Sequence, residues 1–134
     1  MQSKFKNLQT IVGIAKITAI AILAEVQSIE KFATARQLAA YCGLTPTICE
    51  SGSSAHKKSR ISKSENCILR NALYFPAVVA IHRSEHFRSY SKKLLLRGKA
   101  KKQVIVAIMK KIIIAAFAIL KYDCSFDPLL IFHS

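Results

Sequence analysis

The sequence predicts an all-α fold. Alternating apolar and polar runs bounded by turn residues do not occur along the 134 residues, whereas helix start and stop residues recur. Because 51% of the residues are hydrophobic, the chain can bury one core but not two, and we expect a single compact domain over residues 1–134. Within this domain we expect a helix-hairpin-helix (1–28), a loop (44–62), a helical bundle (63–122) and a tail (123–134).

The first two helices are expected on either side of Gly13. A short helix over residues 3–10 precedes this glycine, and a second helix follows it to about residue 28. This is the pattern of a helix-hairpin-helix, whose free backbone N–H groups bind a DNA phosphate without reading base sequence. The phosphate-binding residues would be Gly13, Ile14, Ala15 and Lys16. An ordinary αα-hairpin that turns at Gly13 fits the same pattern.

The third helix and the loop after it follow from local signals. Thr34 and Gln37 stand three residues apart as a capping box, and Gly43 suits the left-handed position just past a helix end. Residues 44–62 are small, polar and basic without periodicity, so we expect a long loop. A loop of this length inside a compact domain suggests function rather than simple connection.

The bundle is expected to contain a helix capped by Ser84, with Phe87, Tyr90 and Leu94 on one face and Gly98 at its end. The last helix is apolar over nearly its whole circumference, so it belongs in the centre of a bundle or against a partner, such as a second subunit of a homo-oligomer. Lysines interrupt its apolar run, and we therefore expect no membrane insertion.

The charge balance points to a polyanion. Lys and Arg total 21 against seven Asp and Glu, which gives a formal net charge of +14. Solvated faces usually mix both signs, but two basic stretches here are almost free of acids. They predict salt-dependent nucleic-acid binding through phosphate contacts. The residues concerned are Lys57, Lys58, Arg60, Lys63, Arg88, Lys92, Arg97, Lys99, Lys101 and Lys102.

Metal and cofactor sites are not expected in this chain. The seven acids are scattered singly, which disfavours a carboxylate metal site or an acid/base pair. The four cysteines form no Cys-x-x-Cys pair, which is typical of a reduced, cytoplasmic protein. A zinc site built from Cys42, Cys49, His56 and Cys67 would have gaps of six, six and ten residues, unlike common zinc motifs, so we expect the cysteines to be small buried apolar residues.

Several short motifs together resemble one known family. They are Leu-Gln-Thr-Ile-Val-Gly-Ile at 8–14, Gly-Leu-Thr-Pro at 43–46, Ser-Gly at 51–52, Arg-Ile-Ser-Lys at 60–63 and Arg-Gly-Lys at 97–99. In this order they resemble the carboxy-terminal domain of DEDD-type insertion-sequence transposases of the IS one-ten family, relatives of Piv-type DNA invertases. The similarity extends over nearly the whole chain.

The resemblance implies a role for Ser51. From the residues alone, this serine fits either a nucleophile or a flexible linker. The family implies that it attacks a DNA phosphodiester and forms a covalent phosphoserine link. The resemblance also implies an amino-terminal RNase H-like domain that holds magnesium with four acids in the complete enzyme, and a structured guide RNA as a further partner. The implied setting is the cytoplasm, in association with the nucleoid.

Departures from the family pattern lead to two hypotheses. Val12, Ala15 and Glu65 stand where the resemblance implies Pro, Gly and Gly, and we expect the family's acidic domain to be missing. We therefore expect a DNA-binding transposase fragment that is inactive without its metal-binding domain. The alternative is a small basic nucleic-acid-binding protein without catalytic activity.

Overall fold

The computed structural model describes residues 2–26, 28–44, 53–128 and 131, and for residues 2 and 53–67 it describes the backbone only. Every regular element in these ranges is helical, so the all-α prediction is confirmed. The elements are α1 (Gln2–Leu8), α2 (Lys16–Val26), a 3₁₀ turn η1 (Ile29–Lys31), α3 (Ala35–Tyr41), α4 (Ser53–Arg83), α5 (Glu85–Leu96) and α6 (Lys101–Tyr122).

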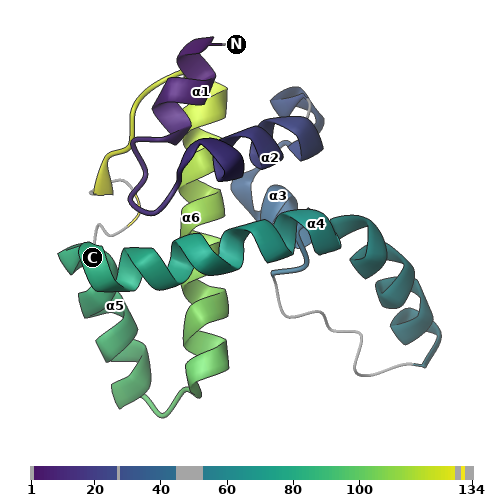
Figure 1. Cartoon of the computed structure of the whole chain (residues 1–134). Coiled ribbons are helices and arrows are strands. Elements are labelled where there is room, and N and C mark those ends of the chain that lie inside the picture. The colour runs from purple at the N-terminus through teal and green to yellow at the C-terminus, as the bar shows by residue number, and fades with distance from the viewer. Residues whose placement is uncertain (1, 27, 45–52, 129–130, 132–134) are drawn as a thin grey trace.

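Helix α6 forms the centre of the core. It packs against α1, η1, α3, α4 and α5, and Figure 1 shows α4 crossing it and α5 beside it. Ile108, Ile112 and Ile113 are fully buried, and each such side chain contributes about 1.5–3 kcal/mol through its removal from water. By length and composition alone α6 could cross a bilayer, but 56% of its most apolar stretch is buried inside the fold, as in the core helix of a soluble protein.

The predicted ends of α3 and α5 are confirmed by hydrogen bonds and backbone angles. The Thr34 hydroxyl accepts from the Gln37 N–H (3.2 Å), and the Gln37 side chain accepts in return from the backbone N–H that precedes Thr34 (2.8 Å). The Ser84 hydroxyl accepts from the third N–H after it, at 3.4 Å. Gly43 and Gly98 have φ of +72° and +90°, which glycine adopts without steric cost.

The turn between α1 and α2 packs directly on α4. Gly13 has a φ of +95°, and a Cβ placed on it would lie 2.5 Å from the carbonyl oxygen of Pro76 in α4. Ile11 and Ile14, on either side of the glycine, are buried in the core. Gly13 is therefore required both by its backbone conformation and by the close approach of two segments.

The sequence predicts a loop over residues 44–62. This prediction is wrong for residues 53–62, because α4 begins at Ser53. Residues 53–62 lack the apolar stripe that identifies an amphipathic helix, but they include alanine, lysine and arginine, which all have high helix propensity. The first part of the predicted loop, residues 45–52, lies outside the described residues.

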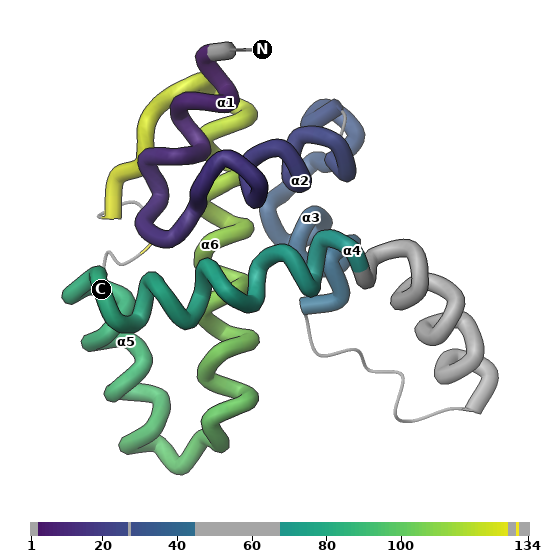
Figure 2. Tube along the Cα trace, in the orientation of Figure 1, coloured from purple at the N-terminus to yellow at the C-terminus, as the bar shows by residue number. Residues whose placement is uncertain are grey.

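The segment after α6 returns along α1. Asp123 ends α6 in the left-handed conformation (φ 50°), and its carboxylate accepts from Ser3 Oγ (3.2 Å) and Asn7 Nδ2 (3.1 Å). The Phe126 N–H donates to Thr10 Oγ1 (2.7 Å). Figure 2 shows this yellow segment beside the purple α1. The described start of the tail is thus held against the first helix.

Candidate nucleic-acid interface

The basic residues of α5 and α6 gather on one hairpin. The two helices pack side by side and are joined by the short turn that contains Gly98 (Figure 2). We call the exposed cations of this unit the basic hairpin. They are Arg88, Lys92, Lys93, Arg97, Lys99, Lys101 and Lys102, and all of them are exposed. The structure therefore brings together the predicted residues of the second basic stretch.

The electrostatics of the basic hairpin follow from sequence and helix direction. No Asp or Glu occurs between Glu85 and Asp123, so no carboxylate lies within either helix after the first residue of α5. The amino terminus of α6, with its partial positive charge, is flanked by Lys99, Lys101 and Lys102. Such a surface attracts phosphate groups.

One predicted contact residue also has a structural role. The Arg88 guanidinium donates from Nη2 to the carbonyl oxygen of His82, at 2.7 Å, near the end of α4. This bond satisfies a helix-terminal carbonyl and holds Arg88 over the junction between α4 and α5. The remaining guanidinium N–H groups of this exposed side chain are the ones that a phosphate would use.

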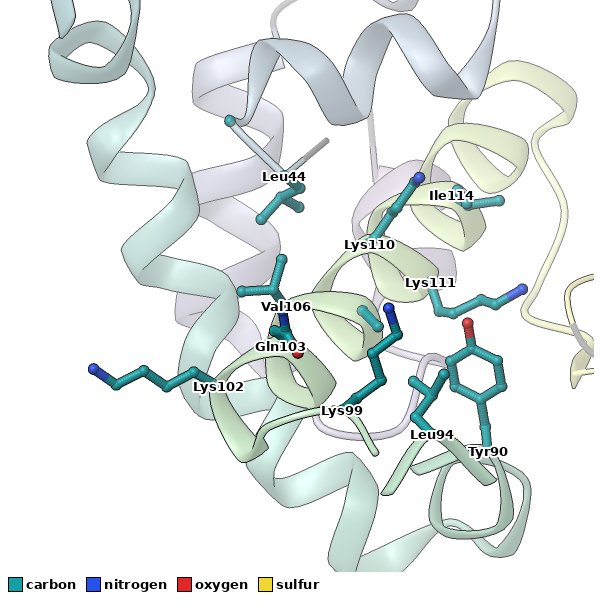
Figure 3. Close-up of a pocket in the computed structure, with 12 residues that line it drawn as sticks. Leu44, Tyr90, Leu94, Lys99, Lys102, Gln103, Val106, Lys110, Lys111 and Ile114 are labelled. Atoms are coloured by element: carbon teal, nitrogen blue, oxygen red, sulfur yellow. The ribbon is translucent and has the colours of Figure 1, made fainter. Parts of the chain in front are cut away.

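A groove along α6 was not predicted from the sequence. Its volume is about 620 Å³, and it lies between α5 on one side and the end of α3 on the other (Figure 3). Its floor is one stripe of α6, made by Gln103, Val106, Ala107, Lys110 and Ile114. Leu44 follows α3 and forms one wall, while Tyr90 and Leu94 of α5 form the other.

The lysines at this groove differ in their surroundings. Lys99, Lys102, Lys110 and Lys111 all line it, and none of its lining residues is acidic. The Lys111 ammonium donates to the carbonyl oxygen of Ile131 (3.0 Å) and lies 5.1 Å from the centre of the Tyr90 ring. Burial, and secondarily the charge of Lys110, lower the pKa of Lys111. Lys111 is thus fixed in the wall of the groove, whereas Lys99 and Lys102 are exposed.

The α1–α2 hairpin presents some of its predicted residues and buries others. Ala15 and Lys16 are exposed at the start of α2, whose first turn contains no acid. Ile14 is buried, whereas Gly13 is partly buried and its Cα faces Pro76. The exposed amino terminus of α2 is open to a phosphate on this side.

The predicted nucleophile Ser51 lies outside the described residues. Lys57, Lys58, Arg60 and Lys63 fall within α4, although their side chains are not described. The relation of these five residues to the basic hairpin therefore remains a prediction from the sequence.

The described side chains do not fit a magnesium site. In the part of the chain that the structure describes, no group of three His, Cys, Asp or Glu residues comes together. Asp123 is occupied by its bonds to α1. Cys42 is fully buried as predicted, and burial raises the pKa of its thiol to about 12, so it is unsuited to metal binding or nucleophilic chemistry.

Comparison with protein families gives the decisive match. Residues 5–92 match the model described as "Transposase IS116/IS110/IS902 family", which is more than half of the chain. The chain belongs to this transposase family. The resemblance inferred from the motifs is therefore confirmed, and the matched region includes α2, α3 and most of α5.

Curated proteins that are similar to this chain are much longer. The chain is 40% identical to the pilin gene-inverting proteins of Moraxella bovis and Moraxella lacunata over 121 residues, which are 90% of this chain and 38% of each relative. It is 30% identical over 114 residues to the IS110 uncharacterized 43.6 kDa protein of Streptomyces coelicolor, of which it spans 28%. The chain thus corresponds to less than half the length of these relatives.

Proposed function

We propose that this chain is the DNA-binding, serine-bearing part of an insertion-sequence transposase or DNA invertase. Family membership places it among transposases, and the observation that supports DNA binding is the basic hairpin of α5 and α6, which carries no acid after the first residue of α5. Phosphate contacts made by such a surface position DNA without selecting base sequence. The exposed start of α2 at Lys16 provides a second phosphate contact, in the manner of a helix-hairpin-helix.

Within this proposal Ser51 is the nucleophile. Its hydroxyl oxygen forms a bond to phosphorus, the phosphodiester bond to the leaving strand breaks, and the leaving hydroxyl takes up a proton. The hydroxyl needs an activating group. The described carboxylates form no cluster that could hold a metal ion for this purpose. We assign the magnesium-binding acids to an RNase H-like domain elsewhere in the complete protein. A structured guide RNA is a partner of the complete protein, which acts in the cytoplasm on nucleoid DNA.

DNA binding by the isolated chain is tested by its dependence on salt. We expect the affinity for duplexes of unrelated sequence to fall ~10³-fold or more between about 50 and 200 mM salt, because six or more phosphate contacts release counterions. Fluorescence anisotropy with labelled duplexes measures this. Affinity that is constant over this range would contradict the proposal.

A charge-matched pair of variants locates the binding surface. Reversal of Arg97, Lys99, Lys101 and Lys102 to Glu should weaken binding uniformly across sequences. The control reverses four exposed cations on α1, η1, α3 and the end of α6, namely Lys6, Lys31, Arg36 and Lys121. Both variants change the net charge equally, so equal losses would show that binding is not centred on the basic hairpin.

The nucleophile is tested separately in a reconstituted reaction. With the RNase H-like domain, guide RNA and DNA ends supplied, Ser51→Ala should abolish strand transfer and the phosphoserine adduct on a suicide substrate, while duplex binding persists. Ser53→Ala is the neighbouring control and should retain activity. Strand transfer by Ser51→Ala would remove this serine from the mechanism and favour a binding function alone.

A further inference from the structure

We propose that the groove along α6 binds an unpaired DNA nucleotide, with the base against the apolar floor and the flanking phosphates on the lysines. This inference rests on the proposed function, because it takes DNA as the ligand. It adds that the surface recognises a distorted or single-stranded segment in preference to a regular duplex.

The floor of the groove suits the face of a base. Val106, Ala107 and Ile114 are partly buried, and Leu44 and Leu94 beside them are buried, which gives a largely apolar surface. A volume of about 620 Å³ is within the range of sites that enclose small organic ligands. Apolar and aromatic surfaces bind any unstacked base through its face, so contact of this kind tolerates all sequences.

The lysines suit the phosphates on either side of that base. Figure 3 shows Lys99 extending from the α5–α6 turn along the open side of α6, and Lys110 projecting from the floor. Since no acid lines the groove, an anionic ligand enters without like-charge repulsion. A base inside a duplex is stacked on both faces, so it reaches the floor only after it leaves the stack.

A second hollow continues the path of the strand. It measures about 560 Å³ and shares Tyr90 and Lys111 with the groove. Glu85, His86, Lys93 and Arg97 of α5 line it, so it is polar rather than apolar, and its cations outnumber its single carboxylate. The wall between the two hollows is held by the hydrogen bond from Lys111 to Ile131 and by the contact of Lys111 with the Tyr90 ring. A strand that crosses this wall places a base on one side and a phosphate on the other.

The test compares two single strands that carry the same number of phosphates. One is a short mixed-sequence DNA oligonucleotide and the other is its abasic counterpart, and both are titrated against the protein by fluorescence anisotropy. We expect the abasic strand to bind about tenfold more weakly, because one base contact of this kind contributes a factor of that order. Binding that depends only on phosphates predicts equal affinities.

A matched pair of substitutions ties the base preference to the groove. Ala107→Phe fills the floor without changing charge and should bring the two affinities within about twofold, while duplex binding stays unchanged. Ala24→Phe makes the same change on the exposed face of α2 and should keep the tenfold preference. Circular dichroism verifies folding, and the wild-type comparison is decisive even where a variant is unstable.

The outcomes separate this inference from the proposed function. Equal affinity of the wild type for both strands, together with salt-dependent duplex binding, overturns the groove inference alone. Retention of the preference in Ala107→Phe also overturns it, because the base would then bind elsewhere. The loss of binding to every DNA probe overturns the proposed function and the inference together.

Discussion

Gly13→Ala tests the packing of the α1–α2 turn on α4. Gly13 combines a φ of +95° with a backbone neighbour, since an added Cβ would lie 2.5 Å from the Pro76 carbonyl oxygen and 3.2 Å from the carbonyl carbon. Real Cβ contacts do not approach this closely. The carbonyl oxygen belongs to α4 backbone, so it cannot rotate away as a flexible side chain would.

The expected destabilisation has two parts. A left-handed conformation costs a residue with a Cβ about 1–2 kcal/mol. Displacement of packed backbone costs about 1–3 kcal/mol, as in other overpacked sites. We therefore expect Gly13→Ala to lower the free energy of unfolding by about 2–5 kcal/mol, a large fraction of the stability of a small domain.

Gly98→Ala is the control for the first part. Gly98 has nearly the same φ, +90°, but nothing lies within 4 Å of an added Cβ. Gly98→Ala should therefore lower the free energy of unfolding by only about 1–2 kcal/mol. Urea unfolding followed by far-UV circular dichroism measures both variants. If both variants lowered the free energy of unfolding equally, the close approach of Gly13 to Pro76 would be refuted, because the left-handed conformation alone would then account for the whole decrease.

Two further predictions concern the core. Ile113→Asp should unfold or aggregate the protein, because an unpaired carboxylate at a fully buried position costs several kcal/mol. Ile20→Asp on the exposed face of α2 is the control and should leave the melting temperature nearly unchanged. Equal melting temperatures for the wild type and Ile113→Asp would contradict the burial of Ile113. Burial raises the pKa of Cys42 from 9.0 to about 12, so the unfolded chain loses this proton first and the free energy of unfolding should fall as pH rises from about 9 towards 12. Cys42→Ala should show a shallower fall in the same urea titrations, and parallel curves would exclude this contribution.

Local sequence signals were sufficient for the ends of α3 and α5 and for the central helix. Thr34, Ser84 and the glycines at 43 and 98 act through hydrogen bonds or backbone angles within a few residues, so their effect can be predicted without knowledge of the fold. The apolar circumference of α6 likewise predicted its central position. The sequence patterns that predict these features can be recognised without knowledge of long-range contacts.

The remaining features depend on contacts or propensities that the periodicity does not reveal. Residues 53–62 have helix-forming composition without an apolar stripe, and this lack of periodicity predicts a loop where the structure has a helix. The groove exists because Leu44, after α3, approaches α6 from a distant part of the sequence. Tyr90 shares a helix face with Phe87 and Leu94, but it is only partly buried and forms a wall rather than core. The location of such residues can be known only from the assembled fold.

The central position of α6 has a consequence for synthesis on the ribosome. The chain is made from the amino terminus at about 5–20 residues per second, so α1, α3, α4 and α5 emerge before the helix against which they all pack. Their apolar faces have no α6 to pack against until residues 101–122 emerge. We therefore expect folding of this domain to be complete only when α6 has left the exit tunnel. A copy of the gene that is interrupted before residue 101 would therefore yield no partial domain, only a chain exposed to chaperones and proteases.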